Sequence, residues 1–383
     1  MLKAFKYRLS PTSKQAKVLQ WTLDRCRELY NAALSERRDA YKYAGKSITC
    51  YEQINDLPEI KEIREEYRDI HSQVLQDTLR RVDKAFKGFF ARCKRGDTPG
   101  FPRFQGRNRY ESFCYPQAGF SLTHDGRVCL SKIGSIKVKL HREVLGKVKT
   151  CTIKREGEYW FVVFSCEVQA NPLEESSEAV GIDLGLLHFA TLSTGETIEN
   201  PRYYRKGEKR LQKHQQSLSR KKRGSHRRHK AVKLVAQAHR KVRNQRQDFL
   251  HKQSRMLVNS YGLIAFEELQ PANMSKRAKP KQDASGAYLP NGASAKSGLN
   301  KSIQDAGWNH FVQYCIYKAE CAGRTVVQVN PKYTSQACSG CGQVRKKELS
   351  ERWHFCDCGT ELDRDHNAAL NILRLGRSQQ GNL

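Results

Sequence analysis

Residues 356–372 read CDCGTELDRDHNAALNI, and this stretch joins two kinds of chemistry. Its first part is a cysteine pair followed by glycine. Its second part places Asp363 and Asp365 directly before a run whose apolar spacing predicts a helix. Another cysteine pair lies upstream, at Cys338 and Cys341 in the sequence CSGCG. The pattern predicts a cysteine module inserted just before a closing helix.

The two cysteine pairs predict a zinc site with the ligands Cys338, Cys341, Cys356 and Cys358. Four thiolates from two turns match the tetrahedral coordination of Zn2+, and a glycine after each pair permits the tight backbone of such turns. The second pair is CxC rather than CxxC, so His354 stays open as an alternative ligand. Iron–sulfur ligation and unrelated buried thiols are the other interpretations. A closed four-ligand site is structural rather than catalytic.

Three acidic residues stand out because they follow or border apolar runs. Asp183 lies in VGIDLG, Glu267 lies in LIAFEEL, and Asp365 precedes the closing helix. An unpartnered buried carboxylate is costly, and a basic neighbour or a divalent cation removes that cost. Mg2+ prefers oxygen ligands, and a pair of such ions supports phosphodiester cleavage. For any one acid a helix cap or an ion pair is the plainer interpretation. We retain this interpretation for Glu268 and Asp363.

The composition points to a polyanionic partner. The chain has 383 residues, and 69 Lys and Arg against 39 Asp and Glu give a net charge of +30. Such self-repulsion destabilises a compact state, and nucleic acid is the commonest compensating partner; an anionic membrane surface is the rival. At about 150 residues per domain, two to three domains are expected. The aromatic content of 9% argues against general disorder.

The sequence contains no apolar run of membrane-spanning length, and its first residues are too polar for a signal peptide. The thirteen cysteines are odd in number, and most are scattered in apolar stretches, which favours reduced thiols plus one metal site. We therefore expect no membrane contact and a cytoplasmic location.

Periodicity predicts helices and strands along the whole chain. Ser10-Pro11 resembles a helix cap followed by a first-turn proline. Gly224 is expected to separate two basic helices. The remaining expectations are an opening strand at 2–9, helices to about Lys42 and over 70–93, short strands over 110–170, a linker at 171–178, buried strands in VGIDLG and YGLIAFEELQ, a flexible loop at 275–300, a helix over 301–322, the strand TVVQV, and a closing helix from DHNAALNILRLG.

Residues 201–255 hold 20 Lys and Arg against two acids, so nucleic-acid contact is favoured over a merely solvated basic face. Aromatic residues interleave the basic segment that precedes the strands, and they could stack on bases or fill a core. The candidate contacts in these two regions are Phe101, Arg103, Phe104, Tyr110 and Tyr115, and Arg220, Lys221, Lys222, Arg223, Arg227 and Arg228.

Several motifs together resemble TnpB, the RNA-guided nuclease of bacterial insertion sequences and apparent ancestor of type V CRISPR effectors. The resemblance covers residue 1 to about 375. The motifs that carry it are GIDLG, FEEL, CSGCG, CGTELDRDHNAALNI, GFPRF at 100–104, AGW at 306–308 and RQDFLHKQS.

The resemblance implies an α+β multidomain fold: a β-barrel with an inserted helical domain, then a RuvC-like, RNase H-type α/β nuclease with an inserted zinc ribbon. The implied partition is a wedge-like barrel domain at 1–10 and 96–172, a helical recognition domain at 11–95, the nuclease at 173–332 and 362–376, the zinc ribbon at 333–361 and a tail at 377–383.

The resemblance also implies an activity, namely guide-RNA-dependent, magnesium-dependent cleavage of target DNA beside a short recognised DNA motif. By motif match the catalytic acids are Asp183, Glu267 and Asp365, which would hold two Mg2+ ions, and the partners are guide RNA and the RNA–DNA heteroduplex. Tyr51 and Gln76 fall at base-reading positions, with Gln73 nearby. Two alternatives are an RNA-guided or zinc-ribbon DNA-binding repressor that does not cleave, and a transposase.

Overall fold

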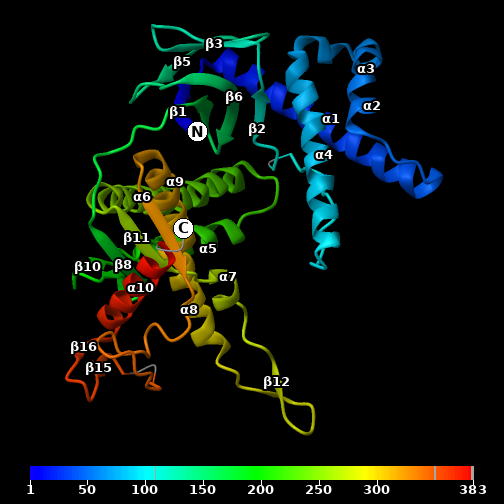
Figure 1. Ribbon diagram of the computed structural model, residues 1–383. Coiled ribbons are helices and arrows are strands. Elements are labelled where there is room, and N and C mark those ends of the chain that lie inside the picture. Colours follow the sequence, from blue (N-terminus) through cyan, green and yellow to red (C-terminus); the bar gives the residue numbers. More distant parts are fainter. Residues whose placement is uncertain (108, 349–350, 381–383) are drawn as a thin grey trace. The chain divides into compact units, whose positions relative to one another are not determined.

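The computed structural model describes residues 1–107, 109–348 and 351–380. The chain divides into two compact units, Met1–Gln169 and Ala170–Leu383, and each is described by itself (Figure 1). Within the described residues, none of the helices combines the length and the apolar character needed to cross a membrane.

The first unit contains a seven-stranded antiparallel sheet in the order β2-β6-β7-β1-β5-β4-β3. The first strand of the chain lies in the middle of the sheet, because Phe5, Tyr7 and Leu9 alternate with basic residues and bury one face. The strands are β1 (Leu2–Ser10), β2 (Ser112–Tyr115), β3 (Phe120–Leu122), β4 (Arg127–Leu130), β5 (Gly134–Lys139), β6 (Lys147–Glu156) and β7 (Tyr159–Glu167). Among the described residues no ladder joins the two edge strands, so closure into a barrel stays a prediction.

Helices occupy the chain between β1 and β2. They are α1 (Ser13–Ala44), α2 (Cys50–Asn55), α3 (Leu57–Ile63), a 3-10 turn (Glu65–Asp69) and α4 (Ser72–Lys94). The expected cap at Ser10-Pro11 is wrong. Ser10 ends β1, and Thr12 caps α1 in a reciprocal capping box with Gln15. Gly45, at a φ of 63°, terminates α1.

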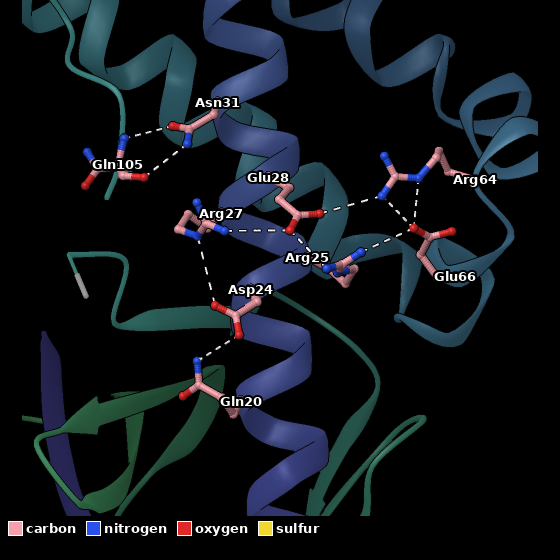
Figure 2. Close-up of polar contacts among 9 residues, drawn as sticks. All are labelled: Gln20, Asp24, Arg25, Arg27, Glu28, Asn31, Arg64, Glu66 and Gln105. Carbon is pink, nitrogen blue, oxygen red and sulfur yellow. Dashed lines mark hydrogen bonds and ion pairs between the residues drawn. The ribbon is translucent and has the colours of Figure 1, made fainter. Parts of the chain in front are cut away.

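Polar side chains along α1 tie neighbouring segments to it, as Figure 2 shows. Arg25 pairs with Glu28 at 2.9 Å and with Glu66 of the 3-10 turn at 3.3 Å. The Asn31 side chain donates to the Gln105 carbonyl at 3.0 Å and accepts from the Gln105 N–H at 2.8 Å. The amide pair anchors the basic aromatic segment around Phe101 and Phe104 to the helix.

The second unit is built on a five-stranded mixed sheet in the order β10-β9-β8-β11-β14. The three strands β8, β11 and β14 are parallel, and β9 and β10 extend the sheet beyond β8 as antiparallel strands. Their bounds are β8 (Ala179–Leu184), β9 (His188–Leu192), β10 (Thr197–Glu199), β11 (Leu263–Glu267) and β14 (Thr325–Val329).

Helices cover both faces of this sheet. One face packs its apolar residues, among them Ile182 and Phe266, against α6 (His226–Ser260) and α9 (Trp308–Ala322). The other face carries α10 (Arg364–Gln380), which lies across β8 and β11 (Figure 1). A Cβ at Gly181 of β8 would lie 2.1 Å from the Ala369 carbonyl of α10. A glycine is therefore required for this close approach.

The remaining elements modify the expected organisation in three places. Residues 293–300 belong to α8 (Ala293–Ala306), so the expected loop at 275–300 is shorter; it contains β12 (Lys281–Gln282) and β13 (Tyr288–Leu289) and is preceded by α7 (Pro271–Met274). The helix expected over 301–322 is two helices, because Gly307 adopts a φ of 70° between α8 and α9. The expected tail at 377–383 begins as helix, since α10 runs to Gln380. As expected, Gly224 separates α5 (Tyr203–Ser219) from α6.

Candidate active site

Asp183 is the second-last residue of β8 and Glu267 the last residue of β11; these neighbouring strands are parallel, and the two acids face the same side of the sheet. Ile182 of β8 pairs with Phe266 of β11, and the two acids follow these residues directly. Side chains alternate along a strand, and both Ile182 and Phe266 point into the core beneath α6 and α9. The two carboxylates therefore point to the opposite side, where α10 lies.

Asp365 reaches the same place from the first turn of α10. The side chain of Asp363 caps this helix, because its Oδ1 accepts from the N–H groups of Asp365 at 2.8 Å and His366 at 3.3 Å. The helix-cap interpretation thus holds for Asp363. Glu268 lies exposed beside Glu267.

The electrostatics indicate that the three acids share one environment. The pKa of Asp183 is raised well above its ordinary value, first by burial and then by the negative charges of Glu267 and Asp365. Burial also raises the pKa of Glu267; a hydrogen bond from Thr334 opposes this, and the charge of Asp365 adds to it. Arg352 and Arg364 each lie 3.9 Å from a carboxylate oxygen of Asp365. Residues separated by 84 and 98 positions in sequence therefore gather at one end of the sheet.

This acidic site fits a divalent cation. Asp183 and Glu267 hold raised pKa values, first because burial disfavours their charged forms and then because neighbouring carboxylates repel them, and an oxygen-preferring cation among them would offset both costs. Arg352 and Arg364, each 3.9 Å from Asp365, offset only part of the negative charge of the site.

The segment that follows β14 supports the acids, although none of its residues was among the predicted catalytic residues. The Thr334 hydroxyl donates to Glu267 Oε1. Two buried amides of α10 hold this segment: Asn371 Nδ2 donates to the carbonyls of Thr334 at 3.0 Å and Ala337 at 2.8 Å, and Asn367 Nδ2 donates to Ala337 at 2.8 Å. A sequence signal existed, since two amides four residues apart interrupt the apolar face of a predicted helix.

The four cysteines form a compact cluster. Their sulfur atoms all lie within 4.8 Å of one another. Sγ of Cys338 is 3.6 Å from that of Cys358, and Sγ of Cys341 is 3.5 Å from that of Cys356. The second pair lies in the turn between β15 (Trp353–Phe355) and β16 (Glu361–Asp363), which leads directly into α10. The CxC spacing therefore still brings both sulfurs to the cluster, and the donor set fits zinc.

Neighbouring groups favour thiolate at part of this cluster. Burial would raise the pKa of Cys338, but hydrogen bonds from Thr360, the Cys341 N–H and His354 lower it to about 5. His354 is buried and contacts Lys347 through Nδ1, and it lies outside the group of four sulfur ligands. The structure therefore places His354 as a neighbour of the cluster rather than as a fifth member.

The expected nucleic-acid contacts in the first unit lie on different elements. Tyr51 of α2 is 78% exposed. Gln73 of α4 accepts a hydrogen bond from the Ala118 N–H at 3.0 Å, so its side chain is engaged within the protein, and Gln76 is half-buried. Phe101 is half-exposed and packs edge-on against Phe86 and Phe89, whereas Arg103 is exposed.

The aromatic residues in and before the strands divide between two roles. Phe104 is 47% exposed, with Arg38 over its ring. Tyr115 is buried in the core of the first unit, and Tyr110 packs against that core. Phe104 thus remains available to a base, and the two tyrosines follow the core interpretation.

In the second unit the basic candidates gather around the turn between α5 and α6. Arg220 follows α5, and Lys222, Arg223 and Arg227 are exposed with it. Arg228 differs, because its Nη1 donates to the carbonyls of Leu218 at 3.1 Å and Lys221 at 3.2 Å and so closes the end of α5. Its guanidinium stabilises the turn.

A mixed α/β architecture that gathers three acids beside a four-cysteine cluster defines a candidate metal-dependent nuclease with a zinc-binding module. Three family models match the chain: "Probable transposase" over residues 163–278, "Cas12f1-like, TNB domain" over 308–372 and "Helix-turn-helix domain" over 1–46. In the structure the last range contains β1 and the single long helix α1.

Two full-length relatives are similar to this chain. "Putative RNA-guided DNA endonuclease InsQ" of Escherichia coli strain K12 is 32% identical over 98% of this chain and 93% of its own length. A "Putative RNA-guided DNA endonuclease" of Streptomyces pristinaespiralis is 33% identical over 98% of this chain and 89% of its own length. A solved Cas12f1-sgRNA-target DNA complex matches 97% of this chain and 99% of its own at 15% identity, with a TM-score of 0.35. The chain belongs to the TnpB family.

Proposed function

We propose that this protein is an RNA-guided DNA endonuclease with a single carboxylate centre. The observation that carries the proposal is the convergence of Asp183, Glu267 and Asp365, from two strand ends and one helix start, into one site where their charges interact. Full-length similarity to relatives named as RNA-guided DNA endonucleases supports the same activity.

Asp183, Glu267 and Asp365 would hold Mg2+ through their carboxylate oxygens. The chemistry supplied by the bound cations is activation of a water and stabilisation of the leaving oxygen in phosphodiester hydrolysis. Thr334 orients Glu267, and the end of the sheet keeps all three acids fixed before substrate arrives. We also propose that the seven-stranded sheet of the first unit forms a β-barrel and that the second unit has a RuvC-like fold.

The four-cysteine cluster would hold one structural Zn2+, with Cys338, Cys341, Cys356 and Cys358 as ligands. Because its second pair lies in the turn that leads into α10, the zinc would fix the helix that carries Asp365.

The nucleic-acid partners would be guide RNA and the RNA–DNA heteroduplex, bound through backbone and shape. The exposed basic turn between α5 and α6 suits phosphates, and the exposed rings of Tyr51 and Phe101 suit unpaired bases. With such partners, the protein would lie in the cytoplasm of a bacterium or archaeon and associate with the nucleoid.

The test is cleavage of target plasmid by the purified ribonucleoprotein in Mg2+. We expect Glu267→Gln to lose at least about a hundredfold in cutting rate while guide-RNA and target binding persist. Glu268→Gln, which removes the exposed neighbouring charge, should cut normally. Asp365→Asn and Asp363→Asn form a second matched pair, because Asn can still cap α10 at position 363.

Two results would replace the proposal. A wild-type complex that binds its target but never nicks it would indicate the repressor. A product in which the 3′ end is joined to a second DNA, rather than released, would indicate the transposase.

A further inference from the structure

A cavity of about 600 Å³ opens next to the carboxylate centre and has no assigned role. It starts at Leu186 and Leu187, three and four residues after Asp183, and extends to Arg202, Arg205 and Arg352. Its volume lies within the range of sites that bind small organic ligands.

The wall of this cavity is electropositive. Arg202 is exposed and has no acidic partner in the part of the chain that the structure describes. Arg205 pairs with Glu208 at 3.2 Å, and Arg352 approaches Asp365 only at 3.9 Å. The single acid of the wall, Asp305, is already neutralised by Arg246 at 2.7 Å.

The backbone holds Arg202 in an unusual conformation. Its φ of 48° and ψ of 48° lie in the left-handed region, which is uncommon for a residue other than glycine. The side chain of Asn200 donates to the Leu186 carbonyl at 2.9 Å, and Arg202 Nη2 donates to the same carbonyl at 3.4 Å. These contacts hold the guanidinium at the wall of the cavity, and backbone strain of this kind often accompanies a binding role.

The cavity adjoins the candidate cleavage centre. Its leucines follow shortly after β8, the strand that carries Asp183, and its Arg352 lies 3.9 Å from a carboxylate oxygen of Asp365. A ligand bound between Arg202 and Arg352 would therefore lie next to a DNA strand whose phosphodiester is bound at the three carboxylates.

We propose that this cavity binds one nucleotide of the single DNA strand that is being cut, next to the scissile phosphate. Planar guanidinium groups of Arg202 and Arg352 would bind the phosphate, which they match by their paired N–H donors. Leu186 and Leu187 would contact the sugar or base face without reading sequence. The inference rests on the proposed nuclease function and names its substrate subsite.

The test measures strand binding separately from cleavage. The Asp183→Ala ribonucleoprotein is titrated with a fluorescent, non-complementary single-stranded DNA of about six nucleotides. Arg202→Gln in this background should weaken binding about tenfold, because it removes one charged phosphate contact. The matched control is Lys206→Gln, one turn along α5, exposed and outside the cavity wall. This variant should change affinity less than about twofold. Unchanged guide-RNA binding and thermal unfolding check that both variants fold.

Two outcomes would overturn the inference. Equal affinities of the Arg202 and Lys206 variants would remove the subsite, whatever the carboxylates do. Thymidine monophosphate is titrated as a second probe. If Arg202→Gln lost binding of this nucleotide but kept the oligonucleotide affinity, the cavity would be assigned to a free nucleotide instead. Because no cleavage is measured, failure here is distinguishable from failure of the nuclease proposal, which depends on the Glu267 and Asp365 variants.

Discussion

At the scale of single residues, the raised pKa of Asp183 makes the candidate site a source of instability when no cation is present. A carboxyl whose folded pKa exceeds its unfolded value of about 4 contributes stability below that value and loses it as the pH rises through the folded pKa. At neutral pH the raised pKa of Asp183 therefore lowers the stability of the folded state relative to acidic pH.

Asp183→Asn should consequently stabilise the metal-free protein at pH 7, by about 1–3 kcal/mol. The gain should vanish as the pH approaches 4, because the wild-type carboxyl is then protonated too. Thermal unfolding in chelator across this pH range is the measurement, with Glu268→Gln as the exposed control. A variant that is less stable than wild type at pH 7 would show that Asp183 is compensated within the protein.

At the scale of elements, the contact between β8 and α10 depends on Gly181. Its missing side chain lets the Ala369 carbonyl and the Leu373 backbone approach the strand, where a Cβ would lie 2.1 and 2.5 Å from them. Because this contact positions the helix of Asp365 over the strand of Asp183, packing and site geometry are coupled.

Gly181→Ala should therefore destabilise the protein by about 1–3 kcal/mol or more and reduce cleavage as well. Gly298→Ala provides the control in α8, because its added Cβ would meet only ordinary contact with Arg205 at 3.7 Å. Chemical denaturation and cleavage rates measure the two effects. Wild-type stability of Gly181→Ala would mean that α10 can shift without cost.

The buried amides of α10 connect the acidic site to the cysteine cluster. Asn371 donates to the carbonyl of Thr334, and the hydroxyl of Thr334 donates to Glu267. Asn367 Oδ1 accepts from the N–H of Ser339, the residue after Cys338, at 2.9 Å. One helix face thus holds the segment that carries both a support of Glu267 and a zinc ligand.

Replacing Asn371 with leucine should leave the Thr334 carbonyl without this donor and cost about 1–3 kcal/mol. We expect zinc to leave such a variant faster, as measured by transfer to a colorimetric chelator after zinc loading. Gln379→Leu, at an exposed position of α10, is the control. Equal zinc release from both variants would show that α10 does not brace the cluster.

At the scale of the whole molecule, the charge of +30 requires counterions or a polyanion. Binding to guide RNA should therefore weaken steeply with salt. Replacing Lys221, Lys222 and Arg223 together with Gln should lower the slope of log affinity against log salt by up to about 0.7 for each phosphate that these side chains no longer neutralise. Filter binding over a salt series measures it, and an unchanged slope would place the RNA elsewhere.

Features that depend on nearby residues were predictable from the amino-acid sequence alone. Cysteine spacing, helical periodicity, the glycine between α5 and α6 and the order of strands and helices all act over a few residues, so they were visible without a fold. Asp183, Glu267 and Asp365 could be nominated by type and context, although nothing local could show that they meet.

Features that depend on distant segments emerged only when the chain was folded. Parallel pairing of β8 with β11 brings Asp183 beside Glu267, and α10 adds Asp365. The cavity at Arg202 and Arg352, and the bracing by Asn371, join residues more than thirty positions apart. Such pairs leave no periodic signal, because chain folding, rather than spacing along the sequence, sets their distance.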